Sequence, residues 1–132
     1  MTLDLAKKLI DAIEEFALSQ GKNVVVAICN SQGNPVAVHV MDDALLVSFE
    51  VAMKKVYTAV SVKMSTKELS ELVQAGKTFY GLQQIDSLMT FGGGVPLKKD
   101  DEIIGGLGIS GGTGEEDHAL CEYGLKVFQS LI

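Results

Sequence analysis

The stretch GGLGISGGTGEEDH, residues 105–118, contains a glycine pattern that could bind a dinucleotide. Gly106, Gly108 and Gly111 match G-x-G-x-x-G, whose glycines permit a tight turn beneath a pyrophosphate in Rossmann domains. That site needs a second parallel strand carrying an acid about twenty residues further on, but only 21 residues follow Gly111, enough for one helix. The three acids of the stretch would also occupy the positive end of that helix and repel a pyrophosphate. The sequence therefore argues against a Rossmann cofactor.

Two glycine-rich loops remain, at 92–94 and 110–112, and each supports two interpretations. Glycine permits positive φ and tight turns, so the loops could simply bend the chain. Alternatively, bare backbone lets a flat or bulky ligand approach closely and meet exposed N–H groups. Gly105, Gly106 and Gly108 favour the second interpretation, since glycines within a strand often mark a close approach. The small-molecule hypothesis therefore predicts that the two loops line one cavity together.

Few other side chains are available for chemistry. The chain has two histidines. His39 lies in a strand-like run, where it could equally have a structural role or act as a ligand. His118 follows three acids in the first turn of a predicted helix. Those acids and His118 splay around the helix, so the run alone predicts no metal site. Lys54 and Lys55 lie within a largely apolar predicted helix. Either their charged ends reach solvent or one pairs with an anion in a pocket. No catalytic triad, paired catalytic acids or P-loop is visible, so no catalytic residue is predicted.

Composition narrows the class of protein. The chain has 132 residues, 47% of them hydrophobic, which suits one globular domain covering residues 1–132. Its net charge of −6 and lack of arginine argue against nucleic-acid binding, and no lysine run is long enough for a membrane patch. Cys29 and Cys121 are too few for a disulfide framework and predict reduced, partly buried thiols. Without a signal-peptide pattern or a long apolar run, a cytoplasmic location is expected.

The first part of the chain predicts a helix and then a hairpin. Apolar residues form one helical stripe that ends at Gly21, a suitable C-cap. The continuous β-branched run at 24–29 is typical of a strand buried on both faces, and residues 36–41 form a second strand. The link at 30–35 is too short for a parallel crossover, so an antiparallel hairpin is expected.

The middle of the chain predicts two helices. Asp42 and Asp43 are candidate N-caps for a long, widely apolar helix that runs to about Lys63. Residues 65–68 form a capping box that opens a shorter helix ending near Gly76.

The last third predicts a hairpin and a final helix. FGGGVPL (91–97) is a glycine-rich loop by composition, KKDDE (98–102) is a charged turn and IIGGLGIS (103–110) is a strand. A second capping box at 113–116 opens the last helix, whose inner face is predicted to carry Leu120, Tyr123, Val127 and Leu131. The order α-β-β-α-α-β-β-α indicates an α+β fold in which helices flank an antiparallel sheet.

Several of these motifs, in this order, resemble the GlcG/HbpS family, which includes the C-terminal domain of PduO-type proteins. They are the hairpin turn NSQGNP, MDDA at 41–44, FGGGVPL, and IIGGLGISGGTGEEDHALCEYG at 103–124. The resemblance covers nearly the whole chain and implies an α+β domain with profilin-like layering that assembles into homo-oligomers. It also implies haem binding, with haem-degrading or redox-sensing roles in some members, beside glycolate or cobalamin-dependent diol and glycerol pathways.

The resemblance gives each candidate residue a specific role. A haem would take its axial ligand from His39 or His118, with Met41 or Tyr57 as weaker alternatives, because neutral imidazole is the usual protein ligand for iron. Lys55 would pair with a propionate and the glycine loops would contact the ring. The first helix has no histidine, so a ligand supplied there in some relatives has no counterpart. The predicted site is His39, Met41, Lys55, Gly92, Gly93, Gly94, Ser110, Gly111, Gly112 and His118.

Three functional hypotheses follow from the sequence. The first is a small ligand-binding protein for haem or another tetrapyrrole. The second is a weak enzyme acting on a small hydroxy or keto acid, or on haem, with Lys54 or Lys55 holding the anion. The third is a structural subunit whose long apolar helix forms the interface with other copies. The expected partners are therefore a small molecule and further copies of the chain, with no nucleic acid and no membrane.

Overall fold

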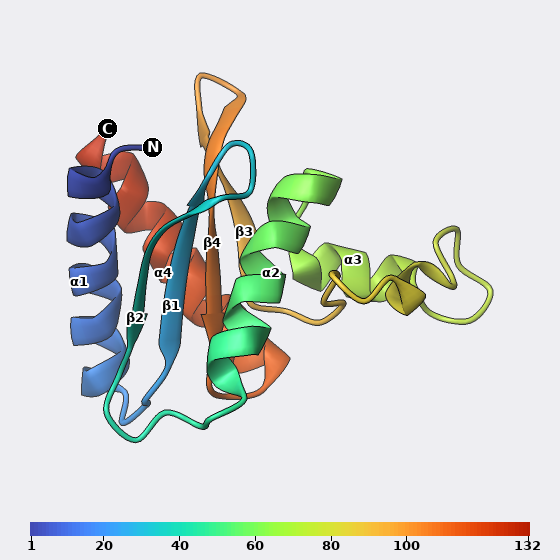
Figure 1. Ribbon diagram of the computed structural model, residues 1–132, viewed down its shortest axis with the longest axis horizontal. Coiled ribbons are helices and arrows are strands. Elements are labelled where there is room, and N and C mark those ends of the chain that lie inside the picture. The colour runs from blue at the N-terminus through green and yellow to red at the C-terminus, as the bar shows by residue number, and fades with distance from the viewer.

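A four-stranded antiparallel sheet forms the centre of the computed structural model, which describes residues 1–132 (Figure 1). Each half of the chain contributes one hairpin, and the two hairpins join through β1 and β4, so that β2 and β3 become the edge strands. The strands are β1 (Val25–Asn30), β2 (Pro35–Val40), β3 (Gly94–Lys99) and β4 (Glu102–Ser110).

Helices cover both faces of this sheet. Two of them, α1 and α4, pack together on one face, and α2 packs on the other against β1, β4 and β3 (Figure 1). The short α3 lies beyond α2, near β3 and the start of α4. The helices are α1 (Leu3–Ser19), α2 (Ser48–Val62), α3 (Thr66–Leu72) and α4 (Gly114–Leu131). The predicted α+β class and the element order are therefore confirmed.

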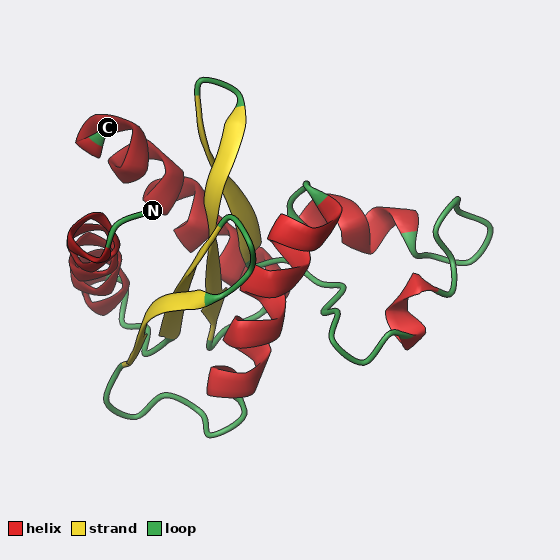
Figure 2. Cartoon of the chain, turned by 45° about the horizontal axis from the view of Figure 1, so that its top comes forward, coloured by secondary structure: helices red, strands yellow, loops and turns green.

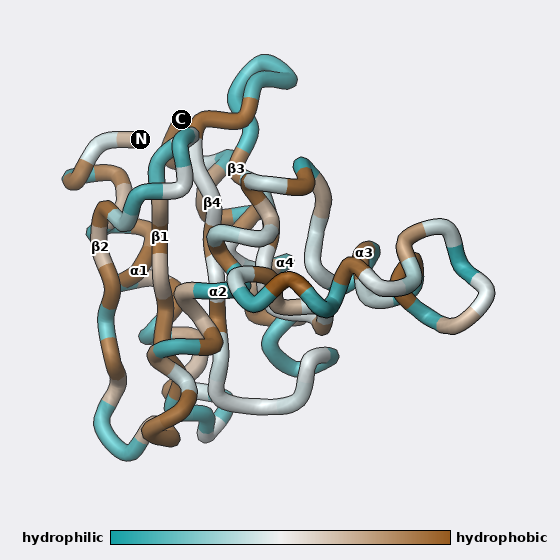
Figure 3. Tube along the Cα trace, turned by 45° about the vertical axis from the view of Figure 1, so that its right-hand side comes forward, coloured by the Kyte–Doolittle hydropathy of each residue, from teal (hydrophilic) through white to brown (hydrophobic).

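The core has two parts, one on each face of the sheet. The larger part joins α1 and α4 to the side chains of β1, β3 and β4 that face them, and the smaller part joins α2 to Val25, Ala27 and Cys29. Strand β1 contributes to both parts and is buried along almost its whole length, as the β-branched run predicted. The apolar residues of β1 contrast with the hydrophilic residues at the tip of the β3–β4 hairpin (Figure 3).

Local chemistry explains both hairpin turns. In the β1–β2 turn, the Asn30 side-chain oxygen accepts hydrogen bonds from the N–H groups of Gln32 and Asn34, and Gly33 has a φ of 82°. In the β3–β4 turn, Asp100 and Asp101 both have positive φ, at 53° and 63°. Two central residues with positive φ match the right-handed twist of the flanking strands. The predicted charged turn is therefore a tight two-residue loop.

The start of α2 differs from its prediction. Asp42 and Asp43 were expected to cap this helix, but it begins at Ser48 after Val47, which makes no side-chain cap bond. Asp43 has a φ of 65°, in the left-handed region, whereas an N-cap residue adopts an extended conformation. Residues 41–47 form successive turns instead, with the Ala44 N–H donating to the Met41 carbonyl. Apolar residues at 44–47 were therefore assigned to the helix when they belong to an exposed loop.

Two other local predictions also need correction. Residues 94–99, expected to belong mainly to a glycine-rich loop, form β3, because the backbone of that segment pairs with β4. On α4, Leu120 is buried and Tyr123 and Val127 pack against the core, as predicted, but Leu131 is exposed. The fully buried positions also include an acid and a glycine, Asp117 and Gly124, which the apolar stripe did not indicate.

A long excursion, which we call the arm, comprises residues 73–90 between α3 and β3. It projects from the α2 side of the molecule and contains one short 3-10 helix, η1 (Leu82–Gln84) (Figure 2). The Met89 N–H donates to the Thr58 hydroxyl at 2.9 Å, which ties the end of the arm to α2. No helix in the structure combines the length and the apolar character needed to cross a membrane.

Candidate functional site

The two glycine-rich loops lie next to each other, as the small-molecule hypothesis predicted. The Gly93 carbonyl accepts a hydrogen bond from the Ile109 N–H at 2.7 Å. Gly92 packs against Gly114, at the start of α4. The segment after β4 and the segment before β3 therefore meet at one end of the sheet, where α2, α3 and α4 also converge.

Most of these glycines, however, are packed against other parts of the chain. A Cβ added to Gly93 would lie 2.6 Å from the Lys55 amino group, and one added to Gly108 would lie 2.5 Å from the Ala52 carbonyl oxygen. Gly94 likewise packs directly against the backbone of α2 at Lys55. The missing side chains let α2 sit unusually close to the sheet. Gly93, Gly94 and the strand glycines therefore face packed neighbours, whereas Gly92 lines a groove of about 580 Å³ together with Phe91, Thr113 and Gly114.

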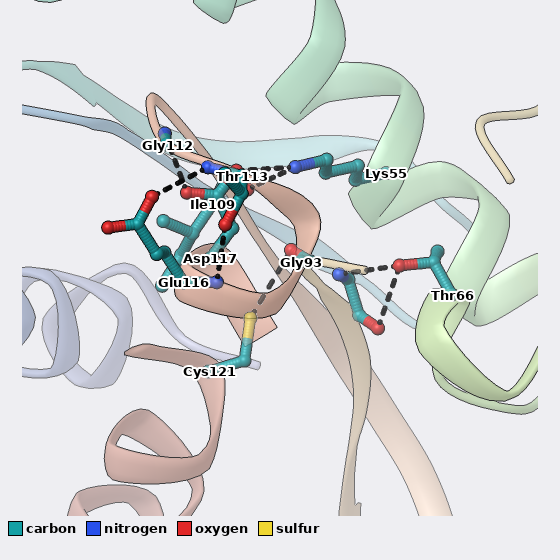
Figure 4. Close-up of polar contacts among 10 residues, drawn as sticks. Lys55, Thr66, Gly93, Ile109, Gly112, Thr113, Glu116, Asp117 and Cys121 are labelled. Carbon is teal, nitrogen blue, oxygen red and sulfur yellow. Dashed lines mark hydrogen bonds and ion pairs between the residues drawn. The ribbon is translucent and has the colours of Figure 1, made fainter. Parts of the chain in front are cut away.

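A buried ion pair organises this closed region (Figure 4). The Lys55 amino group is fully buried and donates to Asp117 Oδ2 at 2.8 Å and to the Ile109 carbonyl at 2.9 Å. The ring of Phe91 covers it, with its centroid 4.8 Å away. Asp117 Oδ1 accepts from the Gly112 N–H at 2.9 Å. All of these groups satisfy one another, so Lys55 joins α2, β4 and α4 rather than binding a ligand anion.

The two cysteines are inert in this setting. Cys121 Sγ donates to the Gly93 carbonyl at 3.2 Å, and burial raises the pKa of its thiol far above the ordinary value. Burial likewise raises the pKa of Cys29 to about 11. Because the thiolate is the reactive form, neither residue is a nucleophile at neutral pH. Both are free and buried, in agreement with the sequence prediction.

His118 lies in an open groove between α4, the edge strand β3 and the start of α3. Its side chain is only 15% exposed, its Nε2 lies 3.3 Å from Glu122 Oε1, and its Nδ1 is buried without a hydrogen-bond partner. Desolvation is the main cause that lowers the pKa of His118; Lys67 also lowers it, while Glu122 opposes the shift. The lowered pKa favours the neutral imidazole form of His118.

The groove around His118 has a volume of about 640 Å³ and a mixed lining. Val95, Pro96 and Leu125 supply apolar surface, while Lys67 and Lys98 supply two positive charges. This volume lies within the range of small-molecule sites, about 300–1,000 Å³. We call it the His118 groove; its remaining lining residues are Ser65, Glu122 and Gln129.

His39 lies at the opposite edge of the sheet, on β2 and against α1. Its Nδ1 is 2.5 Å from Glu14 Oε1, and a groove of about 750 Å³ runs beside it. One ligand atom each from Asp11, Glu14 and His39 lies within 4.8 Å of the others. Carboxylates and imidazole suit a divalent cation, so this is the cluster best able to hold a metal. The groove is strongly acidic because Glu15 and Asp42 also line it.

The predicted site residues therefore fall into three surroundings. Lys55, Gly92, Gly93, Gly94 and Ser110 are buried at the closed junction, with Gly111 and Gly112 at its margin. His118 lies in its own groove. His39 and Met41 lie together in the acidic groove, where Met41 Sδ accepts from the Val24 N–H at 3.5 Å.

Four residues that shape these surroundings were missed in the sequence. Asp117 and Phe91 complete the surroundings of Lys55, and Lys67 and Lys98 flank His118. A signal for Asp117 existed, because Lys55 shares the apolar face of α2 with buried residues and a buried lysine requires a carboxylate partner. No such signal marked the two groove lysines, whose positions depend on how α3 and β3 pack.

Fold and site together define a small α+β protein with ligand-sized surface grooves, two of which hold the histidines at opposite edges of its sheet. A family model, "Haem degrading protein HbpS-like", matches residues 1–126, and the chain belongs to that family. The resemblance predicted from the sequence is therefore confirmed.

Two relatives show how the match is distributed along the chain. An uncharacterised 15.0 kDa protein from the dhaT–dhaS intergenic region of Citrobacter freundii is 38% identical, over 99% of this chain and 94% of its own. The corrinoid adenosyltransferase PduO of Salmonella typhimurium is 50% identical over 71% of this chain but only 29% of its own length. The adenosyltransferase activity of that whole protein is therefore not assigned to this chain.

Solved structures match the fold closely. The Klebsiella pneumoniae protein ORFY superposes with a TM-score of 0.95 at 34% identity, covering 100% of this chain and 92% of its own. The complex of PduOC with haem superposes with a TM-score of 0.90 at 41% identity, covering 96% of this chain and 93% of its own.

Proposed function

We propose that this protein binds haem or a closely related tetrapyrrole in the His118 groove. The observation that carries the proposal is a largely buried imidazole with an unpartnered Nδ1, beside two lysines and an apolar wall. A tetrapyrrole presents matching chemistry, with a flat apolar ring, a metal that accepts imidazole, and two carboxylates. His118 would offer the axial ligand after Glu122 swings away, since that carboxylate is 62% exposed. When bound, the haem iron would supply the redox chemistry.

The acidic groove at His39 suits this ligand less well. Four carboxylates line it, from Asp11, Glu14, Glu15 and Asp42, and no lysine balances them. Each carboxylate near a propionate repels it by about 1 kcal/mol at contact distance even in water. His39 is also already paired with Glu14. Electrostatics therefore favours His118 over His39 as the ligand.

The comparisons support the class of ligand. The PduOC relative was crystallised with haem, and the matching family is described by haem degradation. The PduO relative is a corrinoid enzyme, which supports a place beside cobalamin-dependent diol or glycerol utilisation. A role beside glycolate utilisation and a cytoplasmic location stay predictions.

Hemin titration followed by the Soret band tests the proposal. We expect saturable binding with a shifted Soret maximum, lost or strongly weakened in His118→Ala and retained in His39→Ala. Paired substitution of Lys67 and Lys98 by glutamine should weaken affinity at least tenfold without moving the Soret maximum, since the lysines contact the propionates only. Equal spectra for wild type and His118→Ala would contradict the assignment of the ligand, and no binding by wild type would contradict the function.

The enzyme hypothesis loses one of its two proposed anion-binding groups. Lys55 is fully buried and paired with Asp117, so only Lys54, on the outer side of α2, is free for that role. Ligand binding therefore remains the function that the geometry supports best.

A further inference from the structure

Two residues of α1 and one of β2 bring three potential metal ligands together at the His39 edge of the sheet. Asp11 and Glu14 are three residues apart on α1, so their carboxylates lie on the same face of the helix. His39, on the neighbouring strand β2, places its Nδ1 2.5 Å from Glu14 Oε1. One ligand atom from each residue lies within 4.8 Å of the others. We call these three residues the α1–β2 cluster.

The core holds both elements that carry the cluster. Ile10 and Ile13, the sequence neighbours of Asp11 and Glu14, are fully buried beneath α1. His39 belongs to a strand that pairs with the central strand β1. A site on a helix and a strand keeps its geometry better than a site on a loop. The three side chains are therefore positioned by the fold itself.

The charge around the cluster favours a cation. Glu15 and Asp42 line the same groove of about 750 Å³, so four carboxylates share it with one imidazole. The lysines that form ion pairs do so elsewhere, with Asp4, Glu116 and Asp117. Carboxylates that are close together without a positive partner disfavour one another's charged form. A bound cation would remove this repulsion.

We propose that Asp11, Glu14 and His39 bind one divalent transition-metal ion, with Zn²⁺ and Mn²⁺ as the best candidates. Two carboxylate oxygens and one imidazole nitrogen suit these ions, and water would complete the coordination. Calcium and magnesium instead prefer oxygen ligands alone. Ligand atoms lie roughly 2.0–2.2 Å from such an ion, and therefore about 3–4 Å from one another. The ion would replace the proton between His39 and Glu14, while the exposed side chain of Asp11 turns towards it.

This site is separate from the proposed tetrapyrrole site. The His118 groove lies at the other edge of the sheet and shares no residue with the groove beside His39. His118 also faces a carboxylate, that of Glu122 at 3.3 Å, but no third ligand lies close to this pair. The two histidines should therefore respond differently to a metal ion, and each serves as a reference for the other.

NMR of the histidine side chains tests which ring binds the ion. Isothermal titration of ZnCl₂ into chelator-treated protein should show one Zn²⁺ bound per chain. In nitrogen-15 spectra, Zn²⁺ should shift the ring nitrogens of His39 and leave those of His118 in place, whereas excess Mg²⁺ should shift neither. The chain has only these two histidines, so the spectrum of His39→Gln assigns both sets of signals.

Neutral substitutions of similar shape separate ligation from the general charge of the groove. Glu14→Gln and Asp11→Asn should each weaken Zn²⁺ binding at least about tenfold. Glu15→Gln is the matched control, because it removes the same charge from the same groove, one residue further along α1. It should change the affinity by less than about threefold, and circular dichroism verifies that each variant is folded. Shifts at His118 instead of His39, equal weakening by Glu14→Gln and Glu15→Gln, or no binding at micromolar Zn²⁺ would each overturn the proposal.

Discussion

The Lys55–Asp117 pair shows how the charge of a buried lysine is tolerated inside this protein. Every donor and acceptor around it has a partner, from the Ile109 carbonyl to the Gly112 N–H. A buried pair of this kind is weak evidence for net stabilisation, because desolvation opposes the attraction between the charges. Removal of one partner is different, since the remaining charge stays buried without compensation. The pair therefore acts mainly by fixing α2, β4 and α4 in one arrangement.

Asp117→Ala should destabilise the fold by about 3–5 kcal/mol, because Lys55 would remain buried and unpaired. Urea unfolding followed by circular dichroism measures this loss. Asp4→Ala is a matched control: it breaks the exposed Asp4–Lys8 pair, which has a similar length of 3.0 Å, and should change stability by less than about 1 kcal/mol. A double variant, Lys55→Met with Asp117→Leu, should recover at least half of the loss. Equal effects of Asp117→Ala and Asp4→Ala would contradict the role assigned to burial.

Close packing of α2 on the sheet depends on glycine at the level of secondary-structure elements. Gly108 lies in the middle of β4, beneath Ala52 and Val56 of α2, and its backbone needs no positive φ. Its role is therefore to provide space. The glycines in the strand therefore predicted a close approach correctly, but the group that approaches is helix α2 and not a ligand.

Gly108→Ala should push α2 away from β4 and cost at least about 1–3 kcal/mol, the usual range for overpacking. Gly114→Ala is the control, because its added Cβ would lie 3.1 Å from the nearest atom, the Gly92 nitrogen, and alanine favours the first turn of α4. Unfolding midpoints in urea compare the two variants. Similar midpoints would show that α2 can shift without cost.

Elements with strong periodicity or a clear cap were predictable from the sequence. The run at 24–29 gave β1, and Thr113 with Glu116 forms the capping box that opens α4. The start of α2 was not predictable, because two aspartates resembled caps although Asp43 adopts a left-handed conformation. That conformation is set by the path of the chain from β2 to α2, which is a tertiary constraint.

Individual residues of the candidate site could be predicted from the sequence, but their arrangement in space could not. His118 was identified from its type alone, but its groove depends on Lys67 and Lys98, which come from α3 and β3. For Lys55 the sequence predicted either a charged end in solvent or pairing with a ligand anion, whereas its partner in the structure is an internal carboxylate. Sequence spacing does not tell whether a buried cation meets a ligand or another part of the chain, because both satisfy the same charge.

At the scale of the whole molecule, the His118 groove shares no residue with the shallow groove of about 580 Å³ on α2, which is lined by Phe49, Glu50, Met53, Lys54, Tyr57 and Ser87. The His118 groove follows the β3 edge and α4, whereas the second groove runs along α2. A substitution in the groove on α2 should therefore leave ligand binding at His118 unchanged.

Phe49→Glu should therefore bind one hemin per chain, with an affinity within about threefold of wild type, because Phe49 lies outside the His118 groove. Because a ligand that binds only the folded state stabilises it by RT ln(1 + [L]/Kd), hemin should raise the unfolding midpoints of both proteins by similar amounts. Isothermal titration and thermal melts measure these two quantities, with His118→Ala as the variant that should show neither effect. If Phe49→Glu loses hemin binding while remaining folded, the tetrapyrrole site includes the groove on α2, and the assignment to the His118 groove is wrong.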